Sequence, residues 1–222
     1  MVLTIPPSLS AADDFAVLPS PHQLSVRRAA LELMARADYA TVTVDDIVAK
    51  VGISRRTFFR LFTGKHQVIS CDHAIYSREV LDFLREHDDD RTLSTAAEAG
   101  GLIVSRLTST HEDAELRERL VVSDESLLAE ENRWFTAYQN ALADFLSPRR
   151  GATPPLEAEI LAASIVVAVR VSVRDWLIDP DIAPESTFSS AIEFLRTPTR
   201  RRRMAIIETT LDPDEIMRRL EG

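Results

Sequence analysis

The sequence predicts an all-α protein in which a small N-terminal helix-turn-helix domain precedes a larger helical body. Apolar residues recur at the three- and four-residue spacing of amphipathic helices along most of the chain. No segment alternates apolar and polar residues as a half-buried strand does. Only 6 of the 222 residues are glycine, which disfavours a fold built from tight hairpins, and an apolar fraction of 45% is ordinary for a globular protein.

The N-terminal region is expected to form an arm followed by three short helices. Residues 1–19 show no sustained period and predict a flexible arm. Ser20 can cap the first helix, and Thr43 with Asp46 resembles the capping box that begins the second. Gly52 can adopt a positive φ and end the second helix, and Ser54 can cap the third. The predicted helices cover residues 21–37, 44–51 and 54–62.

The remainder predicts a helical body. Apolar spacing indicates a long helix over residues 65–86 and further helices over 94–109, 113–122, 124–146, 155–178 and 185–196, with one or two more between 204 and 220. We therefore divide the chain into an arm (1–19), a helix-turn-helix domain (20–66) and a larger helical domain (67–222).

Charge is distributed unevenly between these parts. The chain carries a net charge of −9, but residues 22–66 contain eight Lys and Arg against four Asp and Glu, a net +4, which leaves −13 for the rest. This asymmetry suggests a basic functional module on an acidic body. A single cysteine, Cys71, excludes an intrachain disulfide. Without a signal peptide or an apolar run of about 18 residues, we expect a cytoplasmic protein that does not span a membrane.

The third helix has two chemically different faces. Phe58, Leu61 and Phe62 fall on one side at about 100° per residue, which suits packing against the other helices. The opposite side carries Arg55, Arg56, Thr57, Phe59 and Arg60. Arginine suits DNA recognition because its planar fork can bind a phosphate, or the O6 and N7 atoms of guanine, through two hydrogen bonds.

Residues 43–65 (TVDDIVAKVGISRRTFFRLFTGK) resemble the helix-turn-helix signature of the TetR family of transcriptional regulators. The segment 54–60 is similar to that of mycofactocin-type regulators within the family. Two positions depart from the family pattern, because Phe59 stands where Tyr is usual and Leu61 where His or Tyr is common. The resemblance implies a DNA-binding set that consists of Thr43, Ser54, Arg55, Arg56, Thr57, Phe59, Arg60 and Lys65, in which Thr43 and Lys65 meet backbone phosphates.

The resemblance also implies a homodimer that binds a palindromic operator and is released by a small, somewhat apolar effector. It makes residues 67–222 an effector-binding and dimerisation domain. Pairing of the last two major helices would use a seam formed by Ile165, Val166, Val169, Val173, Trp176, Phe188, Ile192 and Leu195. The family fold hollows out the central helices, so Trp134, Phe135, Tyr138, Leu142 and Phe145 are candidates to line an effector pocket. No metal, cofactor or catalytic residue is implied.

Several alternatives remain open at the level of sequence. The recognition arginines could form a solvated basic face, and the aromatic stripe on residues 134–145 could be core. Cys71 and His73 point in different directions on a helix, so we expect a buried cysteine and a surface histidine rather than a catalytic pair. His66 and His73 lack further metal ligands. Residues 200–203 could bind phosphate or pair with the acidic body.

Two rival functions follow from these alternatives. Loss of the usual tyrosine at Phe59 would fit a helical ligand-binding and dimerisation module whose DNA-binding surface is degenerate. An all-helical enzyme is disfavoured, because the sequence has no His-Glu-x-x-His motif, no glycine-rich phosphate loop and no nucleophile in a recognisable setting.

Overall fold

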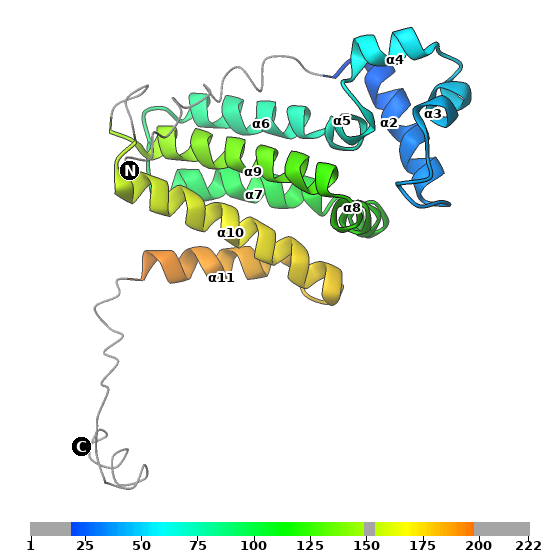
Figure 1. The fold of residues 1–222 in the computed structure, drawn as a ribbon. Helices are drawn as coiled ribbons and strands as arrows, with labels where there is room; N and C mark the ends of the chain where they lie inside the picture. Colours follow the sequence, from blue (N-terminus) through cyan, green and yellow to red (C-terminus); the bar gives the residue numbers. More distant parts are fainter. Residues whose placement is uncertain (1–18, 149–153, 198–222) are drawn as a thin grey trace, which may run out of the picture.

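The computed structural model describes residues 19–148 and 154–197, and every regular element in these ranges is an α-helix (Figure 1). The predicted arm, the helices expected between 204 and 220 and the 200–203 cluster lie outside the described residues. The helices are α2 (Pro21–Met34), α3 (Val44–Val51), α4 (Arg55–Leu61), α5 (Lys65–Ser70), α6 (His73–Glu86), α7 (Leu93–Leu107), α8 (His111–Ser123), α9 (Glu125–Leu146), α10 (Leu156–Ile178) and α11 (Pro184–Arg196). The all-α fold class is confirmed.

The starts of the first helices follow their capping residues. Ser20 and Gln23 form a reciprocal capping box at α2, and Thr43 and Asp46 form one at α3, as predicted. Gly52 ends α3 with φ 77°, a left-handed conformation in which a side chain would be strained. The caps and this glycine fix the turn between α3 and α4.

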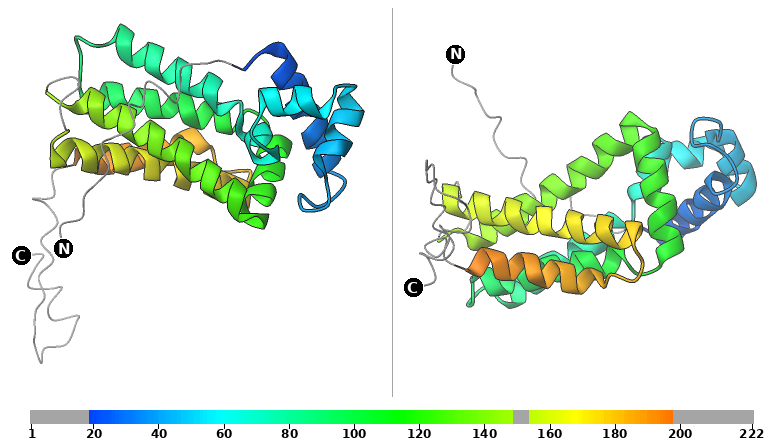
Figure 2. Two further views of the ribbon diagram at one scale, coloured as in Figure 1. Left: turned by 45° about the horizontal axis from the view of Figure 1, so that its top comes forward. Right: turned by 90° about the horizontal axis from the view of Figure 1, so that it is seen from below.

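Helices α2, α3 and α4 pack around a small core at one end of the molecule. Val26, Ile47 and Phe58 are fully buried there. Leu120 of α8 and Leu127 of α9 belong to the same core, so the helix-turn-helix domain packs directly on the body. Both views in Figure 2 place this domain beyond the end of the body's long helices.

The predicted single helix over residues 65–86 is wrong, because the chain forms two helices that differ in direction (Figure 1). The interruption lies at Cys71 and Asp72, where the bonds from Ala74 N to Cys71 O and from Ile75 N to Asp72 O span three residues rather than four. Asp72 accepts a hydrogen bond from Arg27 of α2 at 2.6 Å. This long-range contact accompanies the break and is not visible in local spacing.

The body is a bundle in which α6, α7, α9, α10 and α11 run side by side, with α8 across the end that faces the helix-turn-helix domain (Figure 1). Its core includes Ile103, Tyr138 and Ile165, all fully buried. Gly100 of α7 allows close approach of α10 and α11, since a Cβ there would lie 2.6 Å from Ile165 Cγ2. Within the described residues no helix combines the length and apolarity needed to cross a membrane.

Candidate nucleic-acid interface and ligand pockets

Helix α4 presents a basic face to solvent and an aromatic face to the domain core. Phe58 and Phe62 are buried, whereas Arg55, Arg56 and Arg60 are exposed. The aromatic side chains hold the helix by packing against α2 and α3, and the ring of Phe59 remains half exposed beside the arginines. The two faces therefore separate as the spacing indicates, and their contact with DNA stays a prediction.

The three arginines of α4 differ in their partners. Arg55 Nη1 donates to both carboxylate oxygens of Asp45 at 2.7 Å, and its guanidinium lies 5.7 Å from the centre of the Phe59 ring. Arg56 and Arg60 form no hydrogen bond or ion pair within residues 19–148 and 154–197. Two guanidinium groups are thus available for an external anion without breaking an internal contact.

The hydroxyl groups of the predicted set begin helices. Thr43 Oγ1 accepts from Asp46 N at 3.2 Å and donates to Asp46 Oδ2 at 2.6 Å. These bonds to Thr43 lower the pKa of the Asp46 carboxyl. Ser54 Oγ accepts from Thr57 N at 3.1 Å, and the two hydroxyl oxygens lie 3.0 Å apart. Each of these residues therefore has a capping role in the structure, beside the predicted contact with DNA.

Lys65 points into the domain rather than away from it. Its Nζ donates to Tyr39 O at 2.6 Å and to Val42 O at 3.1 Å, and it lies 4.0 Å from the centre of the Tyr39 ring. Burial lowers the pKa of this amine. Lys65 closes the loop that precedes α3, and its predicted contact with phosphate would use the third N–H of the ammonium group.

The five candidates for an effector pocket are all buried side chains of α9. Tyr138, Leu142 and Phe145 pack in the core of the body. Trp134 lines a groove between the helix-turn-helix domain and the body, and Phe135 lines a pocket within the body. Neither of these two pockets is lined by all five, because α9 turns successive parts of the stripe toward different neighbours.

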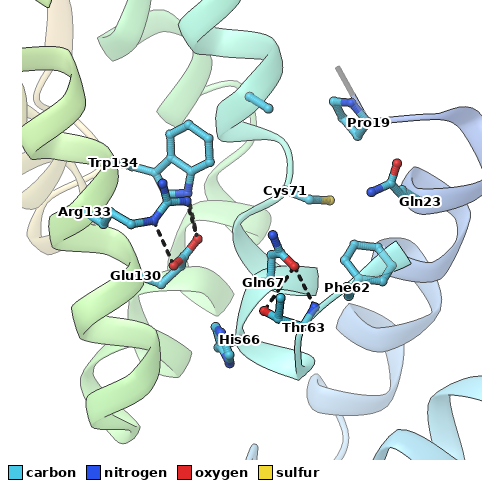
Figure 3. A pocket seen from close by; sticks show the side chains of 11 residues that line it. Pro19, Gln23, Phe62, Thr63, His66, Gln67, Cys71, Glu130, Arg133 and Trp134 are labelled. Atoms are coloured by element: carbon cyan, nitrogen blue, oxygen red, sulfur yellow. Dashed lines mark hydrogen bonds and ion pairs between the residues drawn. The ribbon is translucent and has the colours of Figure 1, made fainter. Parts of the chain in front are cut away.

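The groove between the two parts of the molecule, which we call the junction groove, has a volume of about 440 Å³. Figure 3 shows Gln23 and Phe62 on one side and Glu130, Arg133 and Trp134 on the other. Its charged groups are already paired, since Arg133 Nη2 lies 2.8 Å from Glu130 Oε1 and Trp134 Nε1 donates to the same oxygen at 3.2 Å. The groove has no evident selectivity for one charge.

A second cavity, which we call the body pocket, has a volume of about 330 Å³ and lies between α7, α8, α9 and α10. Its walls are mainly apolar, with Leu107, Val121, Val122, Leu128, Phe135, Val171, Val173 and Leu177 among the lining residues. Three arginines and two glutamates also line it: Arg117, Arg170, Arg174, Glu118 and Glu131. Arg170 Nη2 donates to Asn132 Oδ1 at 2.5 Å, and its guanidinium lies 4.3 Å from the Phe135 ring centre. An apolar chamber with arginines is suited to an amphipathic anion.

A buried polar cluster adjoins the body pocket. His73 of α6, Arg117 of α8 and Glu131 of α9 are in contact, with Arg117 Nη2 between His73 Nε2 and Glu131 Oε2 and 2.5 Å from the latter. His73 Nδ1 lies 2.8 Å from the Tyr138 hydroxyl. The sequence gives no signal for this cluster, because its members come from three helices and share no local motif.

The expectation of a surface histidine at position 73 is wrong, since the His73 side chain is 0% exposed. The face of α6 that carries His73 packs on α9, where Trp134 stacks on the imidazole with 5.5 Å between ring centres. Cys71 is buried as predicted, and burial raises its pKa to about 12. His66 lies in the junction groove, apart from His73, and no group of three metal-ligating residues occurs in the described ranges.

Burial and charge set the ionisation of the cluster. Burial, reinforced by Arg117, lowers the pKa of His73, which is therefore neutral near pH 7. Burial alone would raise the pKa of Glu131, but the adjacent Arg117 guanidinium outweighs it, and the pKa is about 2. The cluster holds one ion pair and one neutral imidazole.

The predicted dimer seam needs correction. Five of its members are buried in the chain's own core: Ile165, Val166, Val169, Phe188 and Ile192. They are unavailable to a second copy because one side of α10 and α11 already packs on α7 and α9. Val173, Trp176 and Leu195 are partly buried. The exposed apolar residues of these two helices are Leu156, Ile160, Val167, Ile178 and Phe194.

A helix with an exposed basic face in a helix-turn-helix arrangement, packed on an all-helical body, is the architecture of helix-turn-helix regulators. The family model described as bacterial regulatory proteins, tetR family, matches residues 26–70. This match and the shared fold confirm the resemblance to TetR-type transcriptional regulators.

Three known proteins illustrate this similarity. A protein of Mycobacterium tuberculosis described as the mycofactocin biosynthesis transcriptional regulator MftR is 24% identical over 180 residues, covering 78% of this chain and 88% of the relative. The fatty acid degradation regulator FadR from Bacillus halodurans has a TM-score of 0.59 at 18% identity, with 82% and 98% of the chains covered. FadR from Bacillus subtilis in complex with stearoyl-CoA has a TM-score of 0.52 at 18% identity, with 78% and 96% covered.

Proposed function

We propose that this chain is a ligand-responsive repressor that binds a palindromic DNA operator as a homodimer and leaves it when an effector binds. The observation that carries the proposal is the exposed face of α4, where Arg56 and Arg60 have no partner among the described residues. Burial of Phe58 and Phe62 fixes the opposite face and so holds this surface outward. A helix presented in this way suits the major groove.

Local charge supports contact with DNA despite the acidic composition. The excess of cations over residues 22–66 would neutralise phosphates, whereas the acidic remainder keeps other surfaces from adhering to the duplex. Asp45 occupies the fork of Arg55 in the free protein. Binding to DNA would exchange this carboxylate for a phosphate or a guanine edge.

The test is a titration of palindromic and random duplexes at two salt concentrations. The protein should show salt-dependent binding to random DNA and an additional, sequence-dependent gain on its operator. Arg55→Ala/Arg56→Ala/Arg60→Ala should remove that gain while the fold is retained. Binding that is absent in the wild-type protein at low salt would instead favour the degenerate-surface alternative suggested by Phe59.

A second copy of the chain is the occupant we propose for the exposed apolar face of α10 and α11. Leu156, Ile160 and Val167 lie on the outer side of α10, and Phe194 is exposed on α11. Side chains this large and apolar on adjacent helices favour burial against a partner. A symmetric dimer would use the same face on both copies and place two α4 helices on one duplex.

An amphipathic anion is the effector class that the body pocket supports. Apolar walls would hold its chain, and Arg170, which has no carboxylate partner among the described residues, would meet its charged group. Stearoyl-CoA, bound by the FadR of similar fold, has this chemistry. Titration with stearoyl-CoA, stearate and octadecanol would test the class, because Arg170→Gln should weaken binding of the two anions and leave the alcohol unaffected.

The proposal carries two further consequences. A DNA-binding regulator acts in the cytoplasm, where the chromosome of a bacterium lies. It also needs no catalytic residue, so an enzymatic activity that survives replacement of the three α4 arginines would support the rival enzyme.

A further inference from the structure

We propose that a chain of contacts through Arg117, His73, Asp72 and Arg27 couples the body pocket to the helix-turn-helix domain. We call these four residues the polar relay. The inference rests on the proposed function only in taking the body pocket as the effector site. It specifies how occupancy of that pocket would reach α2, which packs against α3 and α5.

The relay begins in the wall of the body pocket. Arg117 and Glu131 both line this pocket and form an ion pair at 2.5 Å, with side chains only 13% and 14% exposed. An anion that enters the pocket therefore meets a guanidinium whose present partner is a carboxylate. An anion held at Arg170 in the same pocket would compete with Glu131 for the N–H donors of Arg117, and this competition would draw Arg117 away from Glu131.

A movement of Arg117 would displace His73, which contacts it. Its Nε2 is in contact with Arg117 Nη2, a donor, so Nε2 must accept and Nδ1 must carry the proton toward the Tyr138 oxygen. Trp134 stacks on the ring, and Phe135 meets it edge-on with ring centres 6.4 Å apart. Because the imidazole is closely packed on these sides, it has to move when Arg117 moves.

Asp72 connects the α5–α6 break to the helix-turn-helix domain through its contact with Arg27. It directly precedes His73, at the break between α5 and α6, and its Oδ2 accepts from Arg27 Nη2 at 2.6 Å and from the Tyr76 hydroxyl at 2.9 Å. Arg27 belongs to α2 and also donates from Nε to Ile69 O at 3.2 Å. A displacement of the α5–α6 break thus acts on a charged contact with the first helix of the DNA-binding domain.

The energetics favour transmission through this route. Asp72 Oδ1 is buried and has no hydrogen-bond partner among the described residues, so the carboxylate depends on the contacts of its other oxygen. Losing Arg27 would leave a buried charge without its cation, which is costly. The Asp72–Arg27 contact therefore holds the α5–α6 break in one position against α2. If the break moves, α2 must move with it.

Hydrogen exchange tests the relay without DNA or ligand. Arg117→Met/Glu131→Gln removes the ion pair without leaving one buried charge, and Glu79→Gln is the matched control. Glu79 also lies on α6 and pairs with Arg106 at 2.7 Å, but away from the relay. We expect amides of α2 and of the α5–α6 break to exchange several-fold faster in the double variant and to be unchanged in the control.

Equal exchange in α2 of the double variant and the control would overturn the proposal. If the double variant does not fold, Tyr138→Phe provides a milder change, since it removes only the hydroxyl beside His73 Nδ1. Its expected effect is a smaller rise in exchange at the same amides. No rise there would count equally against the relay.

A second experiment measures coupling directly. The double variant Arg27→Gln/Asp72→Asn removes both charges of this pair and so leaves no buried charge unpaired. It should bind stearoyl-CoA and operator DNA separately as the wild-type protein does, while the factor by which stearoyl-CoA weakens DNA binding falls toward one. An unchanged factor would refute the relay. A wild-type protein that binds neither DNA nor the anion would instead refute the proposed function, and hydrogen exchange would still decide the relay.

Discussion

Two basic side chains of the helix-turn-helix domain, Arg56 and Lys65, differ in their contacts. Arg56 extends from α4 without a partner in the described residues, whereas the Lys65 amine donates to two backbone carbonyls. Arg56 can therefore meet a base edge directly. Lys65 contributes first to the loop that positions α3.

We predict that Arg56→Ala lowers affinity for the operator by about 1–3 kcal/mol and relaxes base preference at one position. Lys65→Ala should weaken binding to all sequences alike and also lower the free energy of unfolding by about 1 kcal/mol, because it removes the bonds to Tyr39 and Val42. Duplex titrations with urea denaturation measure both effects. If Arg56→Ala, like Lys65→Ala, lost as much affinity for random DNA as for the operator, the two residues would not have these different roles.

We predict that the protein loses stability in mild acid because His73 is buried. Its pKa is lowered in the folded protein, so the unfolded chain binds a proton more readily. Below the unfolded value of about 6.5, the free energy of unfolding should fall with pH at up to about 1.4 kcal/mol per unit. Glu131, whose folded pKa is about 2, adds a loss in the same direction only below its ordinary value of 4.5.

Urea denaturation of wild type and His73→Gln between pH 7.5 and 5.5 isolates this contribution. Glutamine does not titrate, and the other histidines are common to both proteins. The wild-type curve should fall more steeply than that of the variant. Parallel curves would show that His73 is not held neutral.

At the scale of elements, the packing of α7 depends on the absence of one side chain. A Cβ at Gly100 would lie 2.6 Å from Ile165 Cγ2 and 2.9 Å from Phe188 Cζ, whereas one at Gly101 would lie 3.8 Å from its nearest neighbour, Phe188 Cε1. The two glycines are adjacent in sequence and have the same helical conformation. They differ in what the neighbouring helices leave open.

We predict that Gly100→Ala lowers the free energy of unfolding by about 1–3 kcal/mol, because Ile165 of α10 and Phe188 of α11 must shift away from α7. Gly101→Ala should be neutral or stabilise by up to about 1 kcal/mol through higher helix propensity. Chemical denaturation compares the pair under the same conditions. A Gly100→Ala protein as stable as its neighbour variant would show that Ile165 and Phe188 adjust freely.

For the whole molecule, the exposed face of α10 determines the proposed assembly. Val167 is 57% exposed on α10, and Val122 is 68% exposed on α8. We predict that Val167→Asp yields a monomer that binds random DNA but loses most operator affinity, because two domains no longer act together. Val122→Asp is the matched control and should remain dimeric.

Sedimentation velocity gives the oligomeric state of these variants, and duplex titrations give the affinities. A Val167→Asp protein that stays dimeric would place the interface elsewhere. If monomer and dimer bound the operator with equal affinity, the proposal that a dimer binds a palindromic operator would be wrong.

Local signals in the sequence predicted much of the fold. Capping residues Ser20, Thr43 and Ser54 marked helix starts, and Gly52 marked a helix end, because each acts within four residues of itself. The same locality allowed the two faces of α4 to be assigned from spacing alone. The candidate ligand sites were less predictable, since the body pocket joins residues of four helices.

The sequence by itself thus determined the helical elements and the basic surface of α4, since hydrogen bonds and periodicity over a few residues suffice for both. Only the tertiary structure decided the break at Asp72, the burial of His73 and which side of α10 is covered. Arg27 lies 45 residues from Asp72, and Arg117 lies 44 residues from His73. Helix α10 is apolar over most of its circumference, so its buried side depends on where α7, α9 and α11 pack.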